Sequence, residues 1–223
     1  MREKYGIIHN DGPVMELTTM IGCPLMCTFC PQESLRTQYG TGVKYMQPMD
    51  LLTALSKLPK NTRIDFSGMS EPWANPECTT MLEMVLYMGF KVAIYTTLYG
   101  MTNPERVKKV LESHPDKVEV VMLHLPDANG NMKGWKYSDE WMENLKVMSQ
   151  LQIPCGVGAM TMDGSGLVAP ELQSVIGRLA GWKGHTRADS LPVEQIGAQD
   201  ISITPRNDFP LTCKSTPFYD RNV

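Results

Sequence analysis

Six short apolar or β-branched runs recur along this 223-residue chain, and helical patterns lie between most of them. The runs cover residues 14–19, 63–67, 91–97, 118–123, 155–161 and 200–204. Near-continuous apolar runs are typical of strands that are covered on both faces, as in parallel sheets. Strands that alternate with helices therefore favour an α/β fold built on a parallel sheet.

Helix starts carry proline and capping signals at several places. One helix is expected over residues 49–58 after Pro48, and others begin at Asn75-Pro76-Glu77, Asn103-Pro104-Glu105, Ser138-Asp139-Glu140 and Ala169-Pro170-Glu171. Proline suits the first helical position, so Pro76 is expected to occupy it and Gly89 to end that helix. The helices from Ser138 and Ala169 are expected to end near Gln152 and Gly181, and residues 182–198 are expected to form a long polar loop before the last strand.

Composition excludes several classes of protein. The hydrophobic content of 42% supports a sizeable core, and a net charge of −3 argues against a general nucleic-acid binder, which would carry a basic stripe. No apolar run approaches the ~20 residues of a membrane span. Six cysteines are too sparse for a disulfide framework, and no signal peptide opens the sequence, so a reducing compartment, the cytoplasm, is expected.

Three of these cysteines lie within eight residues, in the spacing Cys23-x3-Cys27-x2-Cys30. Three thiolates can hold one metal cluster and leave a position open for a substrate or cofactor. A chance group of structural cysteines is the plain alternative. A zinc site usually shows two separated pairs of ligands, and no second Cys-x2-Cys or His-x3-His pair follows here.

This spacing resembles the signature of the radical S-adenosylmethionine (radical SAM) superfamily, and Phe29 fits the aromatic residue usual before the last cysteine. The resemblance implies that Cys23, Cys27 and Cys30 hold three irons of a [4Fe-4S] cluster and that SAM chelates the fourth. It also implies a partial (β/α)6 TIM barrel with parallel strands, whose open side admits a large substrate. A full TIM barrel would need eight strands.

The second expected strand runs into Gly68-Met69-Ser70-Glu71-Pro72, which is similar to the segment that binds the SAM amino group in this superfamily. Small residues let the backbone approach a ligand, and a carboxylate matches an ammonium group. Ser70 stands where glycine is usual. Sites in parallel α/β folds form at the carboxyl ends of strands, so this segment and the cysteine loop are expected at one edge of the sheet.

Other strand ends carry weaker signals. Thr97 lies in a segment that looks like the Thr-Asn-Gly turn of the family, with Leu98 in place of asparagine, and a simple turn is the alternative. His124 stands where the family places a polar contact to SAM, although a structural histidine is equally compatible. Glycines at 156 and 158 in the expected fifth strand suggest close approach of a ligand.

The last third of the chain adds two further expectations from the resemblance. Arg187 lies in a partial match to the Ser-Arg-Ala-Gly-Asn segment and could pair with a carboxylate, or it could be a solvated surface residue. Ile203, in the sixth expected strand, would lie beside the adenine.

The sequence around Cys213 looks like the entry to a SPASM or Twitch extension, which would bring an auxiliary iron–sulfur cluster. The expected organisation is a radical SAM core over residues 1–205 and the start of a truncated extension over residues 206–223, with a free Cys213 thiol as the alternative. Cys78 and Cys155 are expected in a helix and a strand, as small core residues.

The resemblance implies reductive cleavage of SAM to methionine and a 5′-deoxyadenosyl radical, which abstracts hydrogen from a substrate. Related enzymes modify peptides or proteins, or oxidise sugars and small alcohols, and they draw electrons from an external reductant such as flavodoxin or ferredoxin. Enzymes of deazapurine-precursor metabolism form another candidate class. A non-catalytic iron–sulfur or zinc module is the alternative outside catalysis, although an electron carrier would not need the Glu71 turn.

Overall fold

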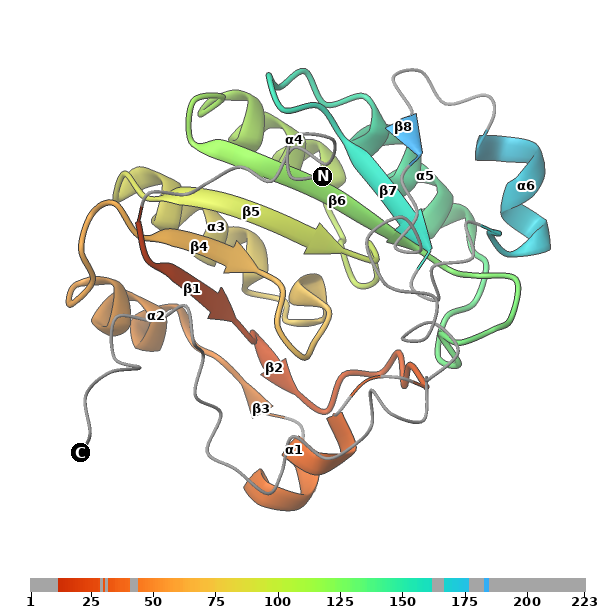
Figure 1. Ribbon diagram of the computed structural model, residues 1–223, viewed down its shortest axis with the longest axis horizontal. Helices are drawn as coiled ribbons and strands as arrows, with labels where there is room; N and C mark the ends of the chain where they lie inside the picture. Colours follow the sequence, from red (N-terminus) through yellow and green to blue (C-terminus); the bar gives the residue numbers. More distant parts are fainter. Residues whose placement is uncertain are drawn as a thin grey trace, which may run out of the picture.

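A six-stranded parallel sheet organises the computed structural model, which describes residues 12–28, 30, 32–40, 44–161, 167–176 and 183–184. The strand order is β1-β4-β5-β6-β7-β8, and every neighbouring pair is parallel. Within the described residues β1 and β8 are the two edges, so the sheet is open (Figure 1). The predicted α/β fold, a partial barrel of parallel strands, is confirmed.

The strands of this sheet are short. They are β1 (Val14–Leu17), β4 (Arg63–Phe66), β5 (Lys91–Thr96), β6 (Val118–Leu125), β7 (Gly158–Thr161) and β8 (Lys183–Gly184). A separate antiparallel pair, β2 (Met20–Ile21) with β3 (Lys44–Tyr45), extends from the end of β1. The helices are α1 (Gln32–Tyr39), α2 (Pro48–Leu55), α3 (Cys78–Tyr87), α4 (Pro104–Glu112), α5 (Asp139–Ser149) and α6 (Pro170–Ile176).

Five of the six predicted strands appear in the sheet, and the sixth position differs. The predicted strand over residues 200–204 lies outside the described residues, and β8 occupies the sixth position instead. Its two residues fall inside the segment expected to be a loop, so that expectation is wrong at Lys183 and Gly184. The reason is register: β8 pairs with Gly158 and Ala159 of β7 through backbone groups, which need no apolar side chains.

Capping explains where two helices begin and corrects a third. Asn103 and Ser138 accept hydrogen bonds from backbone N–H groups in the first turns of α4 and α5, as N-cap residues do. The helix α3 begins at Cys78, and Pro76 is not its first residue. Asn75 prevents the earlier start, because its side chain accepts the Glu77 N–H and donates to the carbonyls of Thr19 and Met46.

The two faces of the sheet differ in character. Ile64 and Phe66 of β4 are fully buried and join an apolar core with residues of α2 and α3, and Figure 1 shows these helices on one side of the sheet. The side chains of Arg63 and Asp65, which alternate with them along β4, point to the opposite, inner face because direction alternates along a strand.

Charged side chains pair with one another on this inner face. Arg63 donates two hydrogen bonds to Asp65, at 2.6 and 2.9 Å, and its third nitrogen lies 3.3 Å from Glu119. Lys91 also contacts Glu119, at 2.6 Å. The inner face of the partial barrel therefore carries paired charges and is polar.

No helix in the described part of the chain has both the length and the apolar character that crossing a membrane would require.

Candidate radical SAM site

The three clustered cysteines lie in the loop between β2 and α1, and all three are partly buried. The loop turns tightly, because Met26 has a positive φ of 47° and the Cys30 N–H donates to the Cys27 carbonyl at 3.0 Å. These turns bring the thiols into one neighbourhood, in which Cys23 and Cys30 act electrostatically on Cys27.

The surroundings of the thiols suit thiolate ligands once a metal is present. Burial first, and then the charges of the neighbouring cysteines, Asp127 and Glu71, together raise the pKa of Cys27 to about 12. Burial also raises the pKa of Cys23 and Cys30, but backbone N–H groups oppose it by favouring the thiolate. For Cys23 these are the N–H groups of Glu71 and Leu25, and for Cys30 that of Gln32. Because a bound metal deprotonates a coordinating thiol, the donor set fits a cluster.

No three His, Cys, Asp or Glu side chains among the described residues are arranged to hold a single metal ion. A single zinc ion needs its ligands to converge on one point. A cluster spreads its thiolates around a body of several irons, so this finding concerns a single-ion site and not a cluster.

The predicted Gly68–Glu71 turn lies directly against the cysteine loop. The Cys30 thiol sits 3.7 Å from the Met69 carbonyl oxygen. Gln32 ties the two segments together, since its amide nitrogen donates to the same Met69 carbonyl and its amide oxygen accepts the Gly22 N–H at 2.9 Å. Sequence reasoning missed Gln32, which stands two residues after Cys30. Two motifs about forty residues apart in the sequence therefore meet at one edge of the sheet, as predicted.

The exit of β1 fixes the shape of this turn. The Gly68 N–H donates to Glu16 at 3.2 Å and the Met69 N–H donates to Thr18 Oγ1 at 3.2 Å. Gly68 has a φ of +72°, and a Cβ there would lie 2.3 Å from Thr18 Oγ1. Glycine is thus required at position 68 for both its conformation and the close approach.

Ser70, which departs from the usual glycine, has a role in this turn. Its hydroxyl accepts the Met20 N–H at 3.4 Å, and Ser70 does not adopt a positive φ. Serine therefore fits position 70 without backbone strain and adds a contact to β2.

Glu71 is buried at the centre of the site, with 4% of its surface exposed. Its Oε1 accepts hydrogen bonds from the Trp73 N–H and the Thr96 hydroxyl, and its Oε2 accepts two from Thr97. Burial raises the pKa of Glu71 to about 7, and the hydroxyl and N–H donors oppose that rise. The carboxylate therefore joins the ends of β4 and β5 in addition to any role toward a ligand.

The Thr97 segment is a strained turn supported from α5. Leu98, which stands where the family has asparagine, adopts a φ of +67° and is fully buried. The Trp141 indole N–H donates to the Thr97 carbonyl at 2.8 Å, and the Asn144 amide donates to the carbonyls of Leu98 and Met101. Packing and hydrogen bonds together hold a non-glycine residue in a left-handed conformation.

The loop after β6 forms the other wall of the cysteine loop, and sequence reasoning gave it no role. Cys27 and Met132 form an antiparallel bridge, and the Thr28 N–H donates to the Asn131 carbonyl at 3.0 Å. The Gly134 N–H donates to the Leu25 carbonyl at 2.7 Å. The run Asp127-Ala128-Asn129-Gly130 carries a turn signal, but no local pattern indicates its distant partner.

His124 lies within β6, and its ring is 6.0 Å from that of Tyr95 on the neighbouring strand. Alternation and register place both residues on the inner face, near the carboxyl ends of their strands. A role toward SAM stays a prediction.

The fifth predicted strand needs a correction. β7 begins at Gly158, and Gly156 lies in the preceding turn with a φ of +68° and open space around its Cβ position. Gly156 therefore lies outside the strand, where its positive φ suits the turn, and close approach of a ligand to these glycines stays a prediction.

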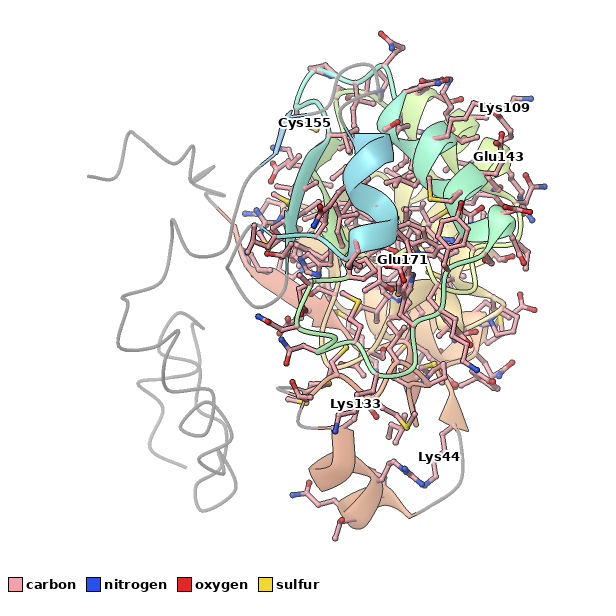
Figure 2. All side chains as sticks on the ribbon, turned by 90° about the vertical axis from the view of Figure 1, so that its right-hand side faces the viewer. Lys44, Lys109, Lys133, Glu143, Cys155 and Glu171 are labelled. Carbon is pink, nitrogen blue, oxygen red and sulfur yellow. The ribbon has the colours of Figure 1, made fainter. Side chains whose placement is uncertain are left out.

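Cys78 and Cys155, which lie outside the cysteine motif, differ in burial. Cys78 is fully buried in α3, as predicted. Cys155 is exposed in the turn before β7, so its prediction as a core residue of a strand is wrong. Figure 2 shows Cys155 at the opposite end of the molecule from Lys133, which belongs to the loop beside the cysteine motif. Phe29, Arg187, Ile203 and Cys213 lie outside the described residues.

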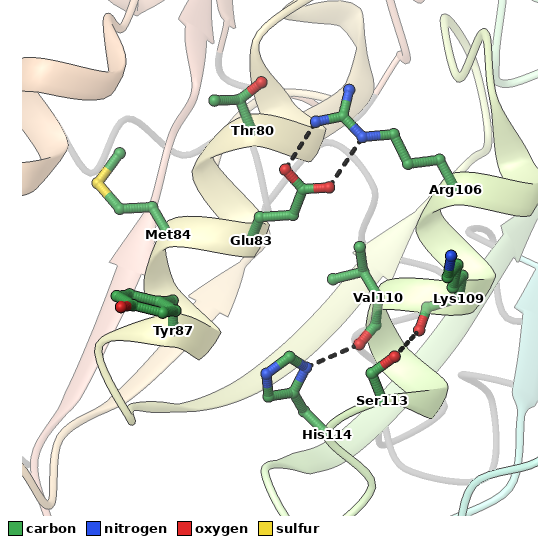
Figure 3. A pocket seen from close by; sticks show the side chains of 9 residues that line it. All are labelled: Thr80, Glu83, Met84, Tyr87, Arg106, Lys109, Val110, Ser113 and His114. Atoms are coloured by element: carbon green, nitrogen blue, oxygen red, sulfur yellow. Dashed lines mark hydrogen bonds and ion pairs between the residues drawn. The ribbon is translucent and has the colours of Figure 1, made fainter.

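A groove of about 610 Å³ lies between α3 and α4, away from the cysteine loop (Figure 3). Four of its polar side chains contact partners within the groove: Glu83 pairs with Arg106, and Ser113 and His114 contact carbonyls of α4. None of the motif residues lines it.

Comparison with known proteins agrees with this geometry. The family model described as "Radical SAM superfamily" matches residues 17–167. Biotin synthase of Ralstonia pickettii (strain 12J) is 25% identical over 200 residues, which are 83% of this chain and 53% of that protein. Biotin synthase of Ralstonia nicotianae (strain ATCC BAA-1114 / GMI1000) is 24% identical over 202 residues, with 84% and 53% covered. The chain thus spans about half the length of the curated relatives it matches.

The family match includes the cysteine loop, the Gly68–Glu71 turn and the ends of β5 and β6, and it covers more than half of the sequence; the chain belongs to the radical SAM superfamily.

Proposed function

We propose that this chain is an enzyme that binds a [4Fe-4S] cluster through Cys23, Cys27 and Cys30 and cleaves SAM reductively beside it. The observation that carries the proposal is the contact between the cysteine loop and the Gly68–Glu71 turn, made by Cys30 and Gln32 at Met69. A cysteine loop that served only as a structural metal site would not need this turn at its side.

A cluster held by Cys23, Cys27 and Cys30 would supply the single electron for reductive cleavage of SAM, and the chemistry at the substrate would be abstraction of a hydrogen atom. The residues of this chain bind and orient. Gly68, Met69 and Ser70 present backbone groups at the strand end, and Glu71 fixes their position. Thr97 and His124 line the adjacent strand ends, and we propose them, with Phe29, Arg187 and Ile203, as further contacts to SAM.

The substrate proposed from the resemblance is a peptide or protein, or a sugar or small alcohol. The polar inner face supports a polar substrate, since it carries Arg63, Asp65 and Glu119, and Tyr95 near the carboxyl end of β5. The named activity of the two matched relatives, biotin synthesis, is not transferred at this identity and coverage. The electron comes from an external carrier such as flavodoxin or ferredoxin, and a reducing compartment such as the cytoplasm suits the thiolate ligands.

Anaerobic reconstitution tests the proposal. The chain should take up about four irons and four sulfides, and should release 5′-deoxyadenosine from SAM when dithionite is added. Cys27→Ala should abolish both results, whereas Cys155→Ala, at an exposed position far from the site, should retain them. Stable zinc binding without iron uptake would refute the proposal.

A further inference from the structure

Asp127 is a buried carboxylate on the loop after β6, where that loop pairs with the cysteine loop. Only 2% of its surface is exposed. Its Oδ1 accepts three hydrogen bonds, from the N–H groups of Asn129 and Asn131 at 3.0 and 3.2 Å and from the Asn131 side-chain amide at 3.0 Å. Its Oδ2 is buried and has no hydrogen-bond partner among the described residues. A buried carboxylate oxygen without a hydrogen-bond partner destabilises the folded state, so its presence at this position needs an explanation.

Asn131 connects Asp127 to the cysteine loop through hydrogen bonds. Its side-chain oxygen accepts the Thr28 hydroxyl at 2.6 Å, and its backbone carbonyl accepts the Thr28 N–H at 3.0 Å. Since Thr28 follows Cys27 directly, a continuous series of hydrogen bonds runs from Asp127 through Asn131 to the residue beside a proposed cluster ligand.

The other contacts of this loop leave little freedom for adjustment. A Cβ on Gly134 would lie 2.0 Å from the Pro24 carbonyl oxygen, so the two backbones touch there. Leu25 and Met132 are both almost fully buried. The Asp127 loop is therefore part of the wall that surrounds the cysteines.

The charge of Asp127 also reaches the ligand position. Asp127 is buried, and the loop that carries it pairs with Cys27 at Met132, so solvent screens its charge from the cysteine loop only weakly. A negative charge at this place disfavours an added electron on a cluster held there.

We propose that Asp127 is a positioning residue of the cluster site that also sets its reduction potential. Through Asn131 it holds the Cys27–Thr28 segment in place, and its buried negative charge lowers the potential at which the cluster accepts one electron from the external carrier. A lower potential makes the reduced cluster a stronger donor, which the cleavage of SAM requires. This inference rests on the proposed function, because it needs the cluster.

The test is an anaerobic potentiometric titration of the reconstituted chain, followed by electron paramagnetic resonance in the absence of SAM. Asp127→Asn keeps the shape and the Oδ1 acceptor and removes the charge. We expect its midpoint potential to rise by about 59 mV, which is a tenfold change in a one-electron equilibrium.

Asp116→Asn is the matched control. Asp116 lies two residues before β6 and Asp127 two residues after it, but the Asp116 side chain is 77% exposed. Its potential should equal that of the unaltered chain.

Equal potentials for Asp127→Asn and Asp116→Asn would overturn the proposal. If Asp127→Asn does not fold, Thr28→Val interrupts the same hydrogen bonds at their other end. It should lose iron to a chelator several times faster than the unaltered chain, and an unchanged rate would overturn the positioning role. An unaltered chain that takes up no cluster would instead refute the proposed function, so the two failures are distinguishable.

Discussion

Glu71 and Thr97 are joined by two hydrogen bonds that end on the same carboxylate oxygen, one from the Thr97 N–H at 2.6 Å and one from its hydroxyl at 2.7 Å. These residues follow neighbouring strands, so the contact fastens the ends of β4 and β5 at the edge where the site forms. The residue that the family resemblance assigns to SAM binding is thus also a structural centre of this edge.

Replacement of Glu71 should therefore destabilise the fold as well as affect SAM. Glu71→Ala leaves four buried donors without their acceptor, and a buried group that loses its partner costs ~1–3 kcal/mol. We expect the free energy of unfolding of the metal-free chain to fall by about 3 kcal/mol in a denaturant titration. Glu83→Gln, at a solvent-exposed ion pair on α3, should leave it nearly unchanged. Equal stabilities for the two variants would contradict the structural role of Glu71.

Gly68→Ala should be more harmful than the same change at Gly89. Both glycines have a positive φ, +72° and +87°, so alanine is strained by ~1 kcal/mol at either position. Only at Gly68 does the added methyl group meet the backbone and hydroxyl of Thr18, and at Gly89 it finds nothing within 4 Å. The overlap should add ~1–3 kcal/mol of destabilisation and reduce cluster uptake. Thermal unfolding and iron content measure both effects, and indistinguishable variants would argue against the close approach.

Ser70→Gly restores the residue usual in the family and should be tolerated. The change removes a long hydrogen bond to the Met20 N–H, so we expect a loss of at most ~1 kcal/mol in the free energy of unfolding. Cluster uptake should be retained, because Ser70 is not a predicted iron ligand. A Ser70→Gly chain that binds no iron would show that the hydroxyl has a role beyond the turn.

Leu98→Asn, which likewise restores the family residue, should have the opposite outcome. Asparagine tolerates the φ of +67°, and the relief of strain is worth ~1 kcal/mol. Leu98 is fully buried, however, and loss of a buried leucine side chain costs ~2–5 kcal/mol. The packing effect is larger, so the melting temperature should fall. A higher melting temperature would mean that strain dominates at this turn.

Periodic patterns predict the long strands of this chain, whereas specific contacts decide its short elements and the start of one helix. The first five strands were predictable because their apolar runs are long enough to show period and burial. The strands β2 and β3 have only two residues each, and α1 has few apolar residues, so none of the three gives a periodic signal. Asn75 shows how one side chain with several hydrogen bonds shifts a helix start that proline alone would place earlier.

The site divides in the same way. The cysteine loop and the Glu71 turn could be placed at one edge of the sheet, because both follow parallel strands. Gln32 and Asn131 could not be predicted, since each acts through hydrogen bonds to a segment that is distant in the sequence. Pairing between residues 27 and 132 depends on how two loops fold back over the sheet edge, and no local sequence pattern predicts it.

Removal of the metal should loosen this loop pairing and leave the sheet intact. The Thr28 and Gly134 N–H groups donate to the carbonyls of Asn131 and Leu25, so their exchange rates report the pairing of the two loops. Three thiolates bound to one cluster fix the cysteine loop, whereas the metal-free loop is held by only a few hydrogen bonds, and local opening then becomes cheaper than global unfolding. We expect anaerobic chelation to speed amide hydrogen exchange at Thr28 and Gly134 by about tenfold or more, which corresponds to ~1.4 kcal/mol of opening free energy.

Ile94 and Val121, which pair within the sheet, are the internal control, and their amides should exchange at unchanged rates. Unchanged protection at Thr28 would mean that the loop is already fixed without metal, and faster exchange at Ile94 would mean that the cluster supports the whole fold.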